Sequence, residues 1–471
     1  MGPRVALAVA FVVGSYALWK ASRPWEQKKI LFFDDDDDGA DSRRTMKHLS
    51  FWRSAAQRAA FFAAEEARTY DAEEPPCPRV FVYDLAPELV DWRPELPNND
   101  TEKATALSSK SEVSVPSVAV DENANLLEVI VRRLATSTRC KARSAESADL
   151  FLIPTLPRAK HWSEWSRLCE TLLEKRRLDR ELPHLTPATA RRHFFVYPRV
   201  AYNAKCRGWW TSPMPLALAS VARVAVGGYE EFRGAFQRPK TLQKLSPDQR
   251  RRPQLLVPRL VSAPYVANVR WSSSQTTRAF SPTRRYLFAY SGTPHGAPAA
   301  VELRLALRAA CDAAPADCAS ASSFSAKGEA KPPFQEWPVE ARLRSTLQMR
   351  NATFCPQPPG LTPGRSSIVT ALLLGCVPVF FSEEQDELWP LHLGGWLRDA
   401  RLFVPAHAIL PDPARLFPRA LRAVSAERLR HMQSAIAAHA RRLQYALDDM
   451  PGDALEVLLR GLKAAAAEDA A

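Results

Sequence analysis

Apolar residues along the chain fall into short strand-like runs that alternate with stretches of helical spacing. Residues 80–85 read as a buried strand, and apolar side chains recur every three or four positions across residues 123–134. Further strands are predicted at residues 149–154, 193–197 and 255–258, with a helix at residues 162–176. Strands that alternate with helices indicate a parallel sheet covered by helices on both faces.

A second α/β run follows, with a strand within residues 284–292 and a helix at residues 301–310. A strand that ends at Cys355, a loop rich in Pro and Gly, a helix at residues 366–374 and a strand at residues 377–381 come next. This order is a βαβ unit, the repeating unit of nucleotide-binding α/β domains. The amino end of its helix could bind an anion, because free N–H groups and the helix dipole favour negative charge there. Alternatively, the unit is a buried crossover that binds nothing.

Helix starts and a polar linker complete the predicted organisation. Ser425 and Asp453 are residue types that begin helices, and each precedes an amphipathic sequence. Residues 272–283, rich in Ser, Thr and Arg, are the predicted domain linker. The fold class is α/β, and we divide the chain into a membrane anchor, a stem, two Rossmann-like domains with parallel sheets, and a terminal helix with its tail, at residues 1–22, 23–76, 77–271, 272–450 and 451–471.

The membrane anchor is predicted from residues 5–19, which carry no charge and lie between Arg4 and Lys20. This stretch is shorter than the roughly 20 residues of a full span, and a cleaved signal sequence is the competing interpretation. No small-residue cleavage site follows at once, so we expect an uncleaved signal anchor. The basic residues after the stretch outnumber Arg4 and oppose a lumenal body by the positive-inside rule. Cysteines and glycosylation sequons favour a lumenal body.

Eight cysteines are spread through the chain, and none has C-x-x-C or zinc-ligand spacing. Their even number fits disulfides in an oxidising compartment, with Cys311 and Cys318 as the clearest local pair. Buried reduced thiols are the alternative. Two N-glycosylation sequons, at Asn99 and Asn351, point to the same compartment. We therefore expect a single-pass type II membrane protein with a lumenal body.

The net charge of the chain limits the classes of binding partner that we expect. Lys and Arg number 64 against 51 Asp and Glu, a net charge of +13 that attracts polyanions. The excess is scattered without a nucleic-acid-binding signature, so nucleic acid is not an expected partner. The acidic run Asp34–Asp38 resembles the metal motif of metal-dependent sugar transferases. Too few residues precede it to build a nucleotide-binding sheet, so we expect a solvated spacer and no metal site. The metal-dependent alternative predicts that deleting the stem abolishes activity.

Five segments, in the same order, resemble motifs of the exostosin-like glycosyltransferase family (glycosyltransferase family 47). The family's Y-V-Y-D-L-P-P strand is similar to residues 81–87, its A-D-L-F-F-V-P strand to residues 148–154, and its histidine-aromatic strand to residues 193–196. The R-x-x-L-x-F-x-G strand is loosely similar to residues 284–292. The most specific motif, S-x-F-C-L-x-P-x-G followed by G-C-I-P-V, resembles residues 353–360 and 375–379.

This resemblance implies a Golgi type II membrane enzyme of GT-B fold, in which two Rossmann-like domains face each other and the second binds the donor nucleotide sugar. It implies inverting transfer from a nucleotide sugar, expected to be UDP-linked, to a polysaccharide or glycoprotein glycan, with no metal or other cofactor. A base then deprotonates the acceptor hydroxyl, while positive charge and helix N–H groups stabilise the departing diphosphate. Whether the protein forms homo- or hetero-oligomers is left open.

Candidate site residues follow from these motifs and from strand ends. Arg365 begins a helix, where a cation is unfavourable unless an anion lies nearby. Glu383 follows a parallel strand at the end where such sheets bind ligands. For donor binding we name Arg284, Arg285, Gly292, Arg304, Gly360, Arg365, Ser366, Ser367, Thr370 and Glu383, and for the general base Asp84, His161, Glu164 and His295. The alternative for each is an ordinary surface or structural residue. Cys355 and Cys376 are expected to be structural.

One helix departs from the family pattern. The helix before G-C-I-P-V usually carries an Arg and then a Glu that contacts hydroxyls of the donor, and the corresponding residues here are Ser367 and Thr370. A hydroxyl lacks the bidentate, charge-assisted hydrogen bonds of a carboxylate. Arg365 could replace the missing Arg. The departure supports a second hypothesis, a catalytically inactive exostosin-like protein that binds glycan or serves as a scaffold in the Golgi.

Overall fold

The computed structural model describes residues 55–66, 76–85, 126–154, 182–197, 222–226, 260–267, 284–292, 294, 298–320, 339–360, 363–446 and 449–467. The chain divides into two compact units, residues 1–47 and 48–471, and every described residue lies in the second. The predicted anchor, the acidic run Asp34–Asp38 and the predicted linker lie outside the described residues. Among the helices that are described, none is long and apolar enough to cross a membrane.

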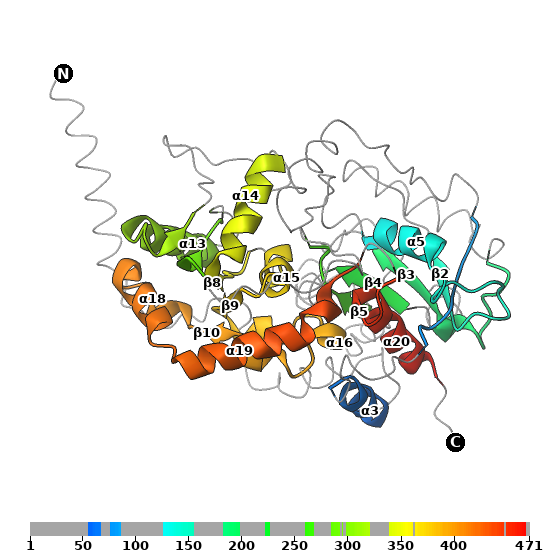
Figure 1. Cartoon of the computed structure of the whole chain (residues 1–471). Coiled ribbons are helices and arrows are strands. Elements are labelled where there is room, and N and C mark those ends of the chain that lie inside the picture. The colour runs from blue at the N-terminus through cyan, green and yellow to red at the C-terminus, as the bar shows by residue number, and fades with distance from the viewer. Residues whose placement is uncertain are drawn as a thin grey trace, which may run out of the picture. The chain divides into compact units, whose positions relative to one another are not determined.

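The first sheet is parallel, and its strands lie in chain order: β1 (Val80–Val82), β2 (Leu150–Ile153), β3 (His193–Tyr197), β4 (Ala222–Val226) and β5 (Leu260–Ala263). The sequence pattern predicts β1, β2 and β3. It does not predict β4, and the strand expected at residues 255–258 lies outside the described residues, just before β5. Helix α5 (Leu126–Thr136) contacts β3 (Figure 1).

The second sheet is also parallel, with β6 (Tyr286–Ala289), β7 (Cys318–Ala319), β8 (Ala352–Pro356), β9 (Val377–Phe380) and β10 (Leu402–Phe403). The order across the sheet is β10-β9-β8-β6-β7. The chain therefore moves outward in one direction from β6 to β7 and in the other from β8 to β10. This doubly wound order confirms the α/β class with parallel sheets. The reversal between β6 and β8 is a topological switch point.

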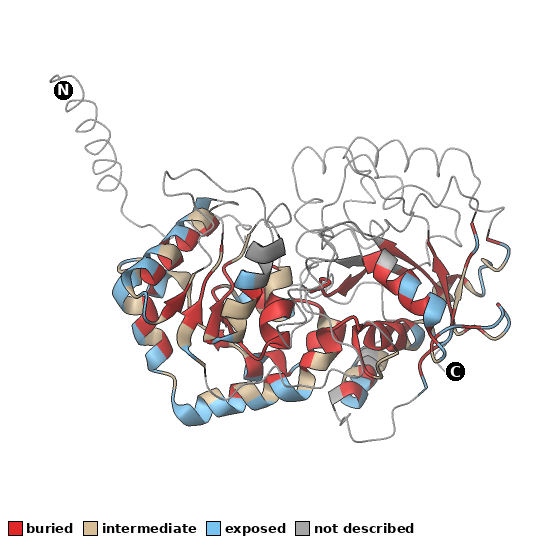
Figure 2. Cartoon of the chain, turned by 45° about the horizontal axis from the view of Figure 1, so that its top comes forward, coloured by how far each residue is buried: buried red, intermediate tan, exposed pale blue. Residues whose placement is uncertain are grey.

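Helices accompany the second sheet: α13 (Pro298–Ala313), α14 (Val339–Arg350), α15 (Ser366–Leu373), α16 (Pro390–Leu393), α17 (Leu397–Ala400), α18 (Pro413–Arg422) and α19 (Ala426–His439). Short 3₁₀ helices are η2 (Ala190–Arg192), η6 (Glu383–Glu387), η7 (Ala406–Ala408) and η8 (Ala440–Leu443). Helix α15 contacts β9 and is buried from Ile368 onward, because its sequence is apolar on every side. Figure 2 shows buried strands and exposed outer faces on α18 and α19.

The two C-terminal helix starts are confirmed. The Ser425 side chain accepts a hydrogen bond from the N–H of Arg428 at 3.2 Å, and α19 follows. The Asp453 carboxylate accepts from the N–H of Glu456 at 3.0 Å and begins α20 (Ala454–Ala466). Helix α20 is buried over most of its length. It contacts β2 and η2 in the half of the chain that forms the first sheet, and α16 and η8 in the half that forms the second sheet.

Helix α3 (Ala55–Glu66) lies in the segment that the sequence assigns to a stem. The structure instead packs it on α20. The Glu65 carboxylate forms an ion pair with Arg460 at 3.0 Å, and the Glu65 carbonyl accepts from Arg442. Residues 55–66 therefore belong to the folded body. A helix pattern alone could not show this, because the partner residues lie nearly 400 positions away in the chain.

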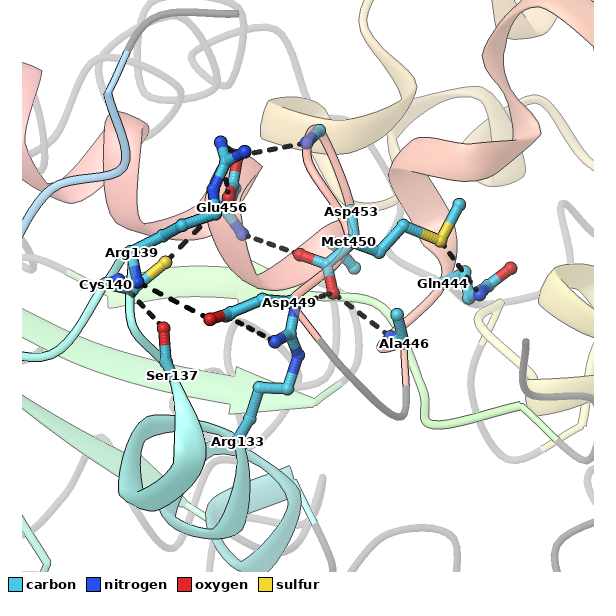
Figure 3. A network of polar contacts seen from close by, with 12 residues as sticks. Arg133, Ser137, Arg139, Cys140, Gln444, Ala446, Asp449, Met450, Asp453 and Glu456 are labelled. Atoms are coloured by element: carbon cyan, nitrogen blue, oxygen red, sulfur yellow. Dashed lines mark hydrogen bonds and ion pairs between the residues drawn. The ribbon is translucent and has the colours of Figure 1, made fainter. Parts of the chain in front are cut away.

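A network of charged side chains joins α5 to the segment before α20 (Figure 3). Arg133 of α5 pairs with Asp449 and, at 3.5 Å, with Asp453. The Asp449 carboxylate also accepts from the N–H of Thr138 at 2.7 Å. Both Arg133 and Asp453 are buried. The C-terminal segment is therefore bonded to the helix of the first sheet.

Three disulfides are described: Cys77–Cys140, Cys311–Cys318 and Cys355–Cys376. The predicted local pair Cys311–Cys318 is confirmed. Cys355 and Cys376, expected to be structural, join the end of β8 to the residue before β9. No described cysteine is free.

Candidate functional site

The switch point of the second sheet brings two segments of the chain together. Residues 290–292 follow β6, and residues 357–360 follow β8, the neighbouring strand. Because the strands are parallel, both segments leave the sheet at the same edge. Open α/β sheets bind ligands outside the carboxyl ends of their strands at such a point. Predicted residues Gly292 and Gly360 both lie there.

A pair of glutamines fixes the segment after β8. The backbone N–H of Gln357 donates to the carbonyl of Val379 at 2.9 Å, and the Gln357 carbonyl accepts from the Gln385 side chain at 2.9 Å. The Gln385 oxygen accepts in turn from the N–H of Phe381 at 3.0 Å. The Ser367 hydroxyl donates to the Gln357 side chain at 2.6 Å. These bonds hold the loop against β9 and α15. Sequence reasoning missed both glutamines, although Ser382 and Gln385 have capping-box spacing.

Two arginines converge on this loop. Arg304 of α13 is only 2% exposed and donates from Nε and Nη2 to the carbonyl of Pro359, both at 3.2 Å. Arg365, the residue before α15, donates from Nη1 to the carbonyl of Pro358 at 2.7 Å. Burial, with a contribution from the charge of Arg365, lowers the pKa of Arg304 to about 10, so this guanidinium stays charged at neutral pH. Positive charge therefore gathers at the amino end of α15, which already favours an anion.

Tyr290 lies beside this charge. Its side chain is 3% exposed, and its hydroxyl has no hydrogen-bond partner among the described residues. Burial raises the pKa of Tyr290 to about 12, although the positive charges of Arg304 and Arg365 act to lower it. A β-carbon at Gly292 would overlap the phenol. Sequence reasoning named Gly292 but missed Tyr290, because an aromatic residue at a strand end looks like core.

The other residues near α15 that were predicted to bind the nucleotide sugar differ in burial and in hydrogen bonding. Ser366 and Ser367 form the first turn of α15. Thr370 is 1% exposed, and its hydroxyl has no partner among the residues that the structure describes. Glu383 is exposed at the start of η6, just after the carboxyl end of β9. All four lie in the segment from α15 to η6, and Ser367 bonds to the loop directly.

Arg284 and Arg285 are not brought into this group, because they precede β6 and so lie at the opposite edge of the sheet. Arg284 donates to the carbonyl of Leu374 at 2.8 Å and to that of Arg350. Burial lowers the pKa of Arg284 to about 10. Arg285 is exposed, with its guanidinium 5.1 Å from the ring centre of Tyr286. The described contacts of Arg284 and Arg285 are therefore with other parts of the fold and do not include the loop at residues 357–360.

Of the four candidates for the general base, Asp84 alone lies among the described residues. His161, Glu164 and His295 lie outside the described residues. Asp84 is exposed, just after the carboxyl end of β1 in the first sheet. The neighbouring Tyr83 is buried, and its hydroxyl lies 2.8 Å from Nε2 of His193.

Among the described residues, one group of metal-ligating types is close-packed: Cys77, Cys140 and Glu456. The two sulfurs are bonded to each other in a disulfide, so this group offers no metal site. The positive charge beside the loop at residues 357–360 comes from the side chains of Arg304 and Arg365.

The comparisons with known proteins identify the family. Residues 76–388, more than half of the chain, match the Exostosin GT47 domain. No curated protein sequence matches the chain. Among solved structures, the chain is similar to WaaG, a glycosyltransferase involved in lipopolysaccharide biosynthesis, with 8% identity over 70% of this chain and 93% of that one and a TM-score of 0.34. It is similar to the glycosyltransferase VinC in complex with DTDP, with 12% identity over 72% and 97% and a TM-score of 0.31. It is also similar to UGT89C1 of Arabidopsis thaliana complexed with quercetin, with 12% identity over 79% and 84% and a TM-score of 0.29. From the family match, the chain belongs to the exostosin GT47 family and is a glycosyltransferase.

Proposed function

We propose that this glycosyltransferase binds a nucleotide sugar, UDP-linked, at the switch point of its second sheet and transfers the sugar to a polysaccharide or glycoprotein glycan. The observation that carries the proposal is the convergence of Arg304 and Arg365 on the Pro358–Pro359 carbonyls at the amino end of α15. Two guanidinium groups beside helix N–H groups match the charge of a diphosphate. In this proposal, the phosphates lie beside Arg304 and Arg365, the two arginines that bond to the loop.

The reaction we propose is a single displacement with inversion. The acceptor oxygen forms a bond to the anomeric carbon while the bond from that carbon to the diphosphate oxygen breaks. A base takes the proton of the acceptor hydroxyl, and Asp84, His161, Glu164 and His295 are the candidates. Negative charge grows on the departing diphosphate, where Arg304, Arg365 and the first N–H groups of α15 stabilise it. No metal takes part in this proposal.

We also propose the GT-B arrangement and a lumenal Golgi location. Two parallel sheets in one chain support the former. Three described disulfides support an oxidising compartment, with residues 1–22 as the membrane anchor. Asn351, the first residue of a sequon, is exposed in the turn between α14 and β8. In secretory-pathway expression, glycosidase treatment should increase gel mobility, and Asn351→Gln should remove the part of that shift due to this site. A protein that carries no N-glycan on any residue contradicts the lumenal location.

The donor site is tested by comparing two arginines of equal charge at opposite edges of one sheet. Arg365→Ala should weaken UDP binding about tenfold to a hundredfold, because a charge-assisted hydrogen bond is lost. Arg285→Ala removes the same charge from the other edge and should change the Kd less than twofold. Calorimetry with UDP, followed by transfer assays over a panel of UDP- and GDP-sugars, measures both. Equal losses in the two variants, or no binding of any nucleotide by the wild type, would contradict the proposed site.

A further inference from the structure

The Tyr290 hydroxyl is a polar group that the described residues leave unsatisfied. It is buried and has no hydrogen-bond partner within the described part of the chain. Buried hydroxyl groups in folded proteins are normally paired, since losing water without gaining a partner is unfavourable. The described residues therefore give no structural reason for a hydroxyl at this position. A phenylalanine would fill the same space without the unpaired oxygen.

The position of Tyr290 indicates which partner is missing. The residue directly follows β6, one of the two strands that flank the switch point, and its N–H donates to the carbonyl of Ala319 at 3.0 Å. This bond fixes the residue beside β7. The charges of Arg304, Arg365 and Arg308 lie close enough to act on the phenol. Arg308 is paired with Asp312 at 2.8 Å, whereas Arg304 and Arg365 hold the loop after β8.

Gly292 keeps space around the hydroxyl. A side chain there would overlap the phenol ring and its oxygen. Because the phenol stays neutral at physiological pH, it offers an O–H donor to an electron-rich oxygen. A donor next to two guanidinium groups, at the edge where parallel sheets bind ligands, suits an anionic oxygen.

We propose that Tyr290 is a donor-binding residue whose hydroxyl donates a hydrogen bond to an oxygen of the diphosphate of the nucleotide sugar. This inference rests on the proposed function, because it assumes that the diphosphate lies beside Arg304 and Arg365. It adds a neutral donor to those two charges and explains the unpaired hydroxyl: the ligand supplies the acceptor that the described residues do not.

The test is Tyr290→Phe, and the matched control is Tyr286→Phe, at the first residue of β6, the strand that Tyr290 follows. Tyr290→Phe should weaken binding of UDP and of inorganic pyrophosphate about tenfold or more, because a hydrogen bond to a charged group is lost. The variant should leave the melting temperature of the ligand-free protein unchanged or raise it, because an unsatisfied buried oxygen is removed. Tyr286→Phe should alter neither Kd.

The outcomes separate this inference from the proposed function. If Arg365→Ala weakens UDP binding but Tyr290→Phe does not, the donor site stands and the role of Tyr290 is wrong. If Tyr290→Phe lowers the melting temperature of the ligand-free protein, the hydroxyl has a structural role, and the inference is overturned. If the wild type binds neither UDP nor pyrophosphate, the proposed function itself fails. Weaker binding of both ligands with undiminished stability supports the inference.

Discussion

At the scale of single residues, His392 ties the stability of the protein to pH. It lies buried in α16, with Nε2 at 3.0 Å from the carbonyl of Ala454, so Nε2 carries the proton and donates. Burial lowers the pKa of His392 from 6.5 to about 3. The unfolded chain binds a proton near pH 6.5 and the folded chain does not. The stabilising effect of this residue is therefore complete above pH 6.5 and is lost as the pH falls toward 3.

We predict that His392→Gln reduces the loss of stability in acid. Glutamine can donate to the same carbonyl but does not titrate. Between pH 7.5 and pH 5, the wild type should lose about 2 kcal/mol more of its unfolding free energy than the variant does, from the protonation of one unfolded-state histidine. Urea denaturation at the two pH values measures this. His193 also has its pKa lowered by burial, to about 4, and affects both proteins equally. Identical losses in the two proteins contradict the prediction.

At this scale, the positions of some residues near the candidate site could be predicted from the sequence, and those of others could not. Arg304 and Arg284 look alike in the sequence, since each is an arginine near the apolar run that forms strand β6. One follows that strand and reaches the carboxyl edge from a helix, whereas the other precedes it and binds carbonyls at the opposite edge. Arg365 could be predicted because a helix start has a defined electrostatic preference. Gln357 and Gln385 could not, because their roles depend on hydrogen bonds between separate loops.

At the scale of elements, the disulfide Cys355–Cys376 closes the loop and helix that form the proposed donor site. It spans 21 residues, whereas Cys311–Cys318 spans 7. By loop entropy, Cys355→Ala with Cys376→Ala should cost about 3 kcal/mol of unfolding free energy and Cys311→Ala with Cys318→Ala about 2 kcal/mol. We predict that only the first pair of substitutions also weakens UDP binding, because it frees the loop held by Gln357. Urea titration and calorimetry on both variants measure the two effects. Equal Kd values would contradict this link between the disulfide and the site.

Helix α3 should contribute to stability through one buried ion pair. Glu65→Ala removes the carboxylate that pairs with the buried guanidinium of Arg460 at 3.0 Å, while Glu456 pairs with the same guanidinium at the longer distance of 3.5 Å. We predict a loss of about 3 kcal/mol, because breaking a buried pair leaves a poorly compensated charge. Asp317→Ala breaks the exposed pair between Asp317 and Arg422 and should cost at most about 1 kcal/mol.

Chemical denaturation of both variants, with Glu65→Leu and Arg460→Met combined as a third protein, tests the role of α3. The apolar pair should recover most of the loss, since it removes both buried charges. If Glu65→Ala behaves like Asp317→Ala, α3 is not held by this pair, and the stem assignment of residues 55–66 returns.

Elements differed in how well the sequence could predict them. Helix α15 begins where its apolar run begins, and α19 and α20 begin after the predicted capping residues, because these are local signals. Strand β4 has only five residues, and two of its central positions are alanine or arginine, so no strong strand signal marks it. The sheet order is set by pairing between distant segments, which a local pattern does not contain. The switch point and the site built on it therefore appear only in three dimensions.

At the scale of the whole molecule, the C-terminal segment makes the two halves depend on each other. Helix α20 contacts β2 and η2 as well as α16 and η8. Arg133 of α5 bonds to Asp449 and Asp453, which lie just before α20 (Figure 3). Asp453 is fully buried, and burial raises its pKa to about 6, while the charge of Arg133 acts to lower it. The charge of Arg133 in α5 therefore favours the ionised form of the residue that caps α20.

We predict that Arg133→Met destabilises both halves together and that the loss grows with pH. Removing the guanidinium leaves Asp453 buried without its cation, which should cost about 3–5 kcal/mol at neutral pH. Without Arg133 the pKa of Asp453 rises further, so the folded chain keeps a proton that the unfolded chain, with a pKa of 3.8, releases. The stability of the variant therefore falls as the pH rises through the folded pKa.

Hydrogen exchange followed by mass spectrometry distinguishes a local effect from a global one. If α20 couples the halves, peptides from β9 should exchange faster in Arg133→Met although they lie far from α5 in the chain. Adding Asp453→Asn to the same protein should remove the pH dependence, because the amide does not titrate and still accepts the hydrogen bond from the N–H of Glu456. Faster exchange confined to α5 and β3 would show that the halves unfold separately. Exchange that rises in β9 as well shows that the second sheet depends on the first for its stability, so the loop to which Arg365 bonds, in the proposed donor site, is stabilised by contacts across the described chain.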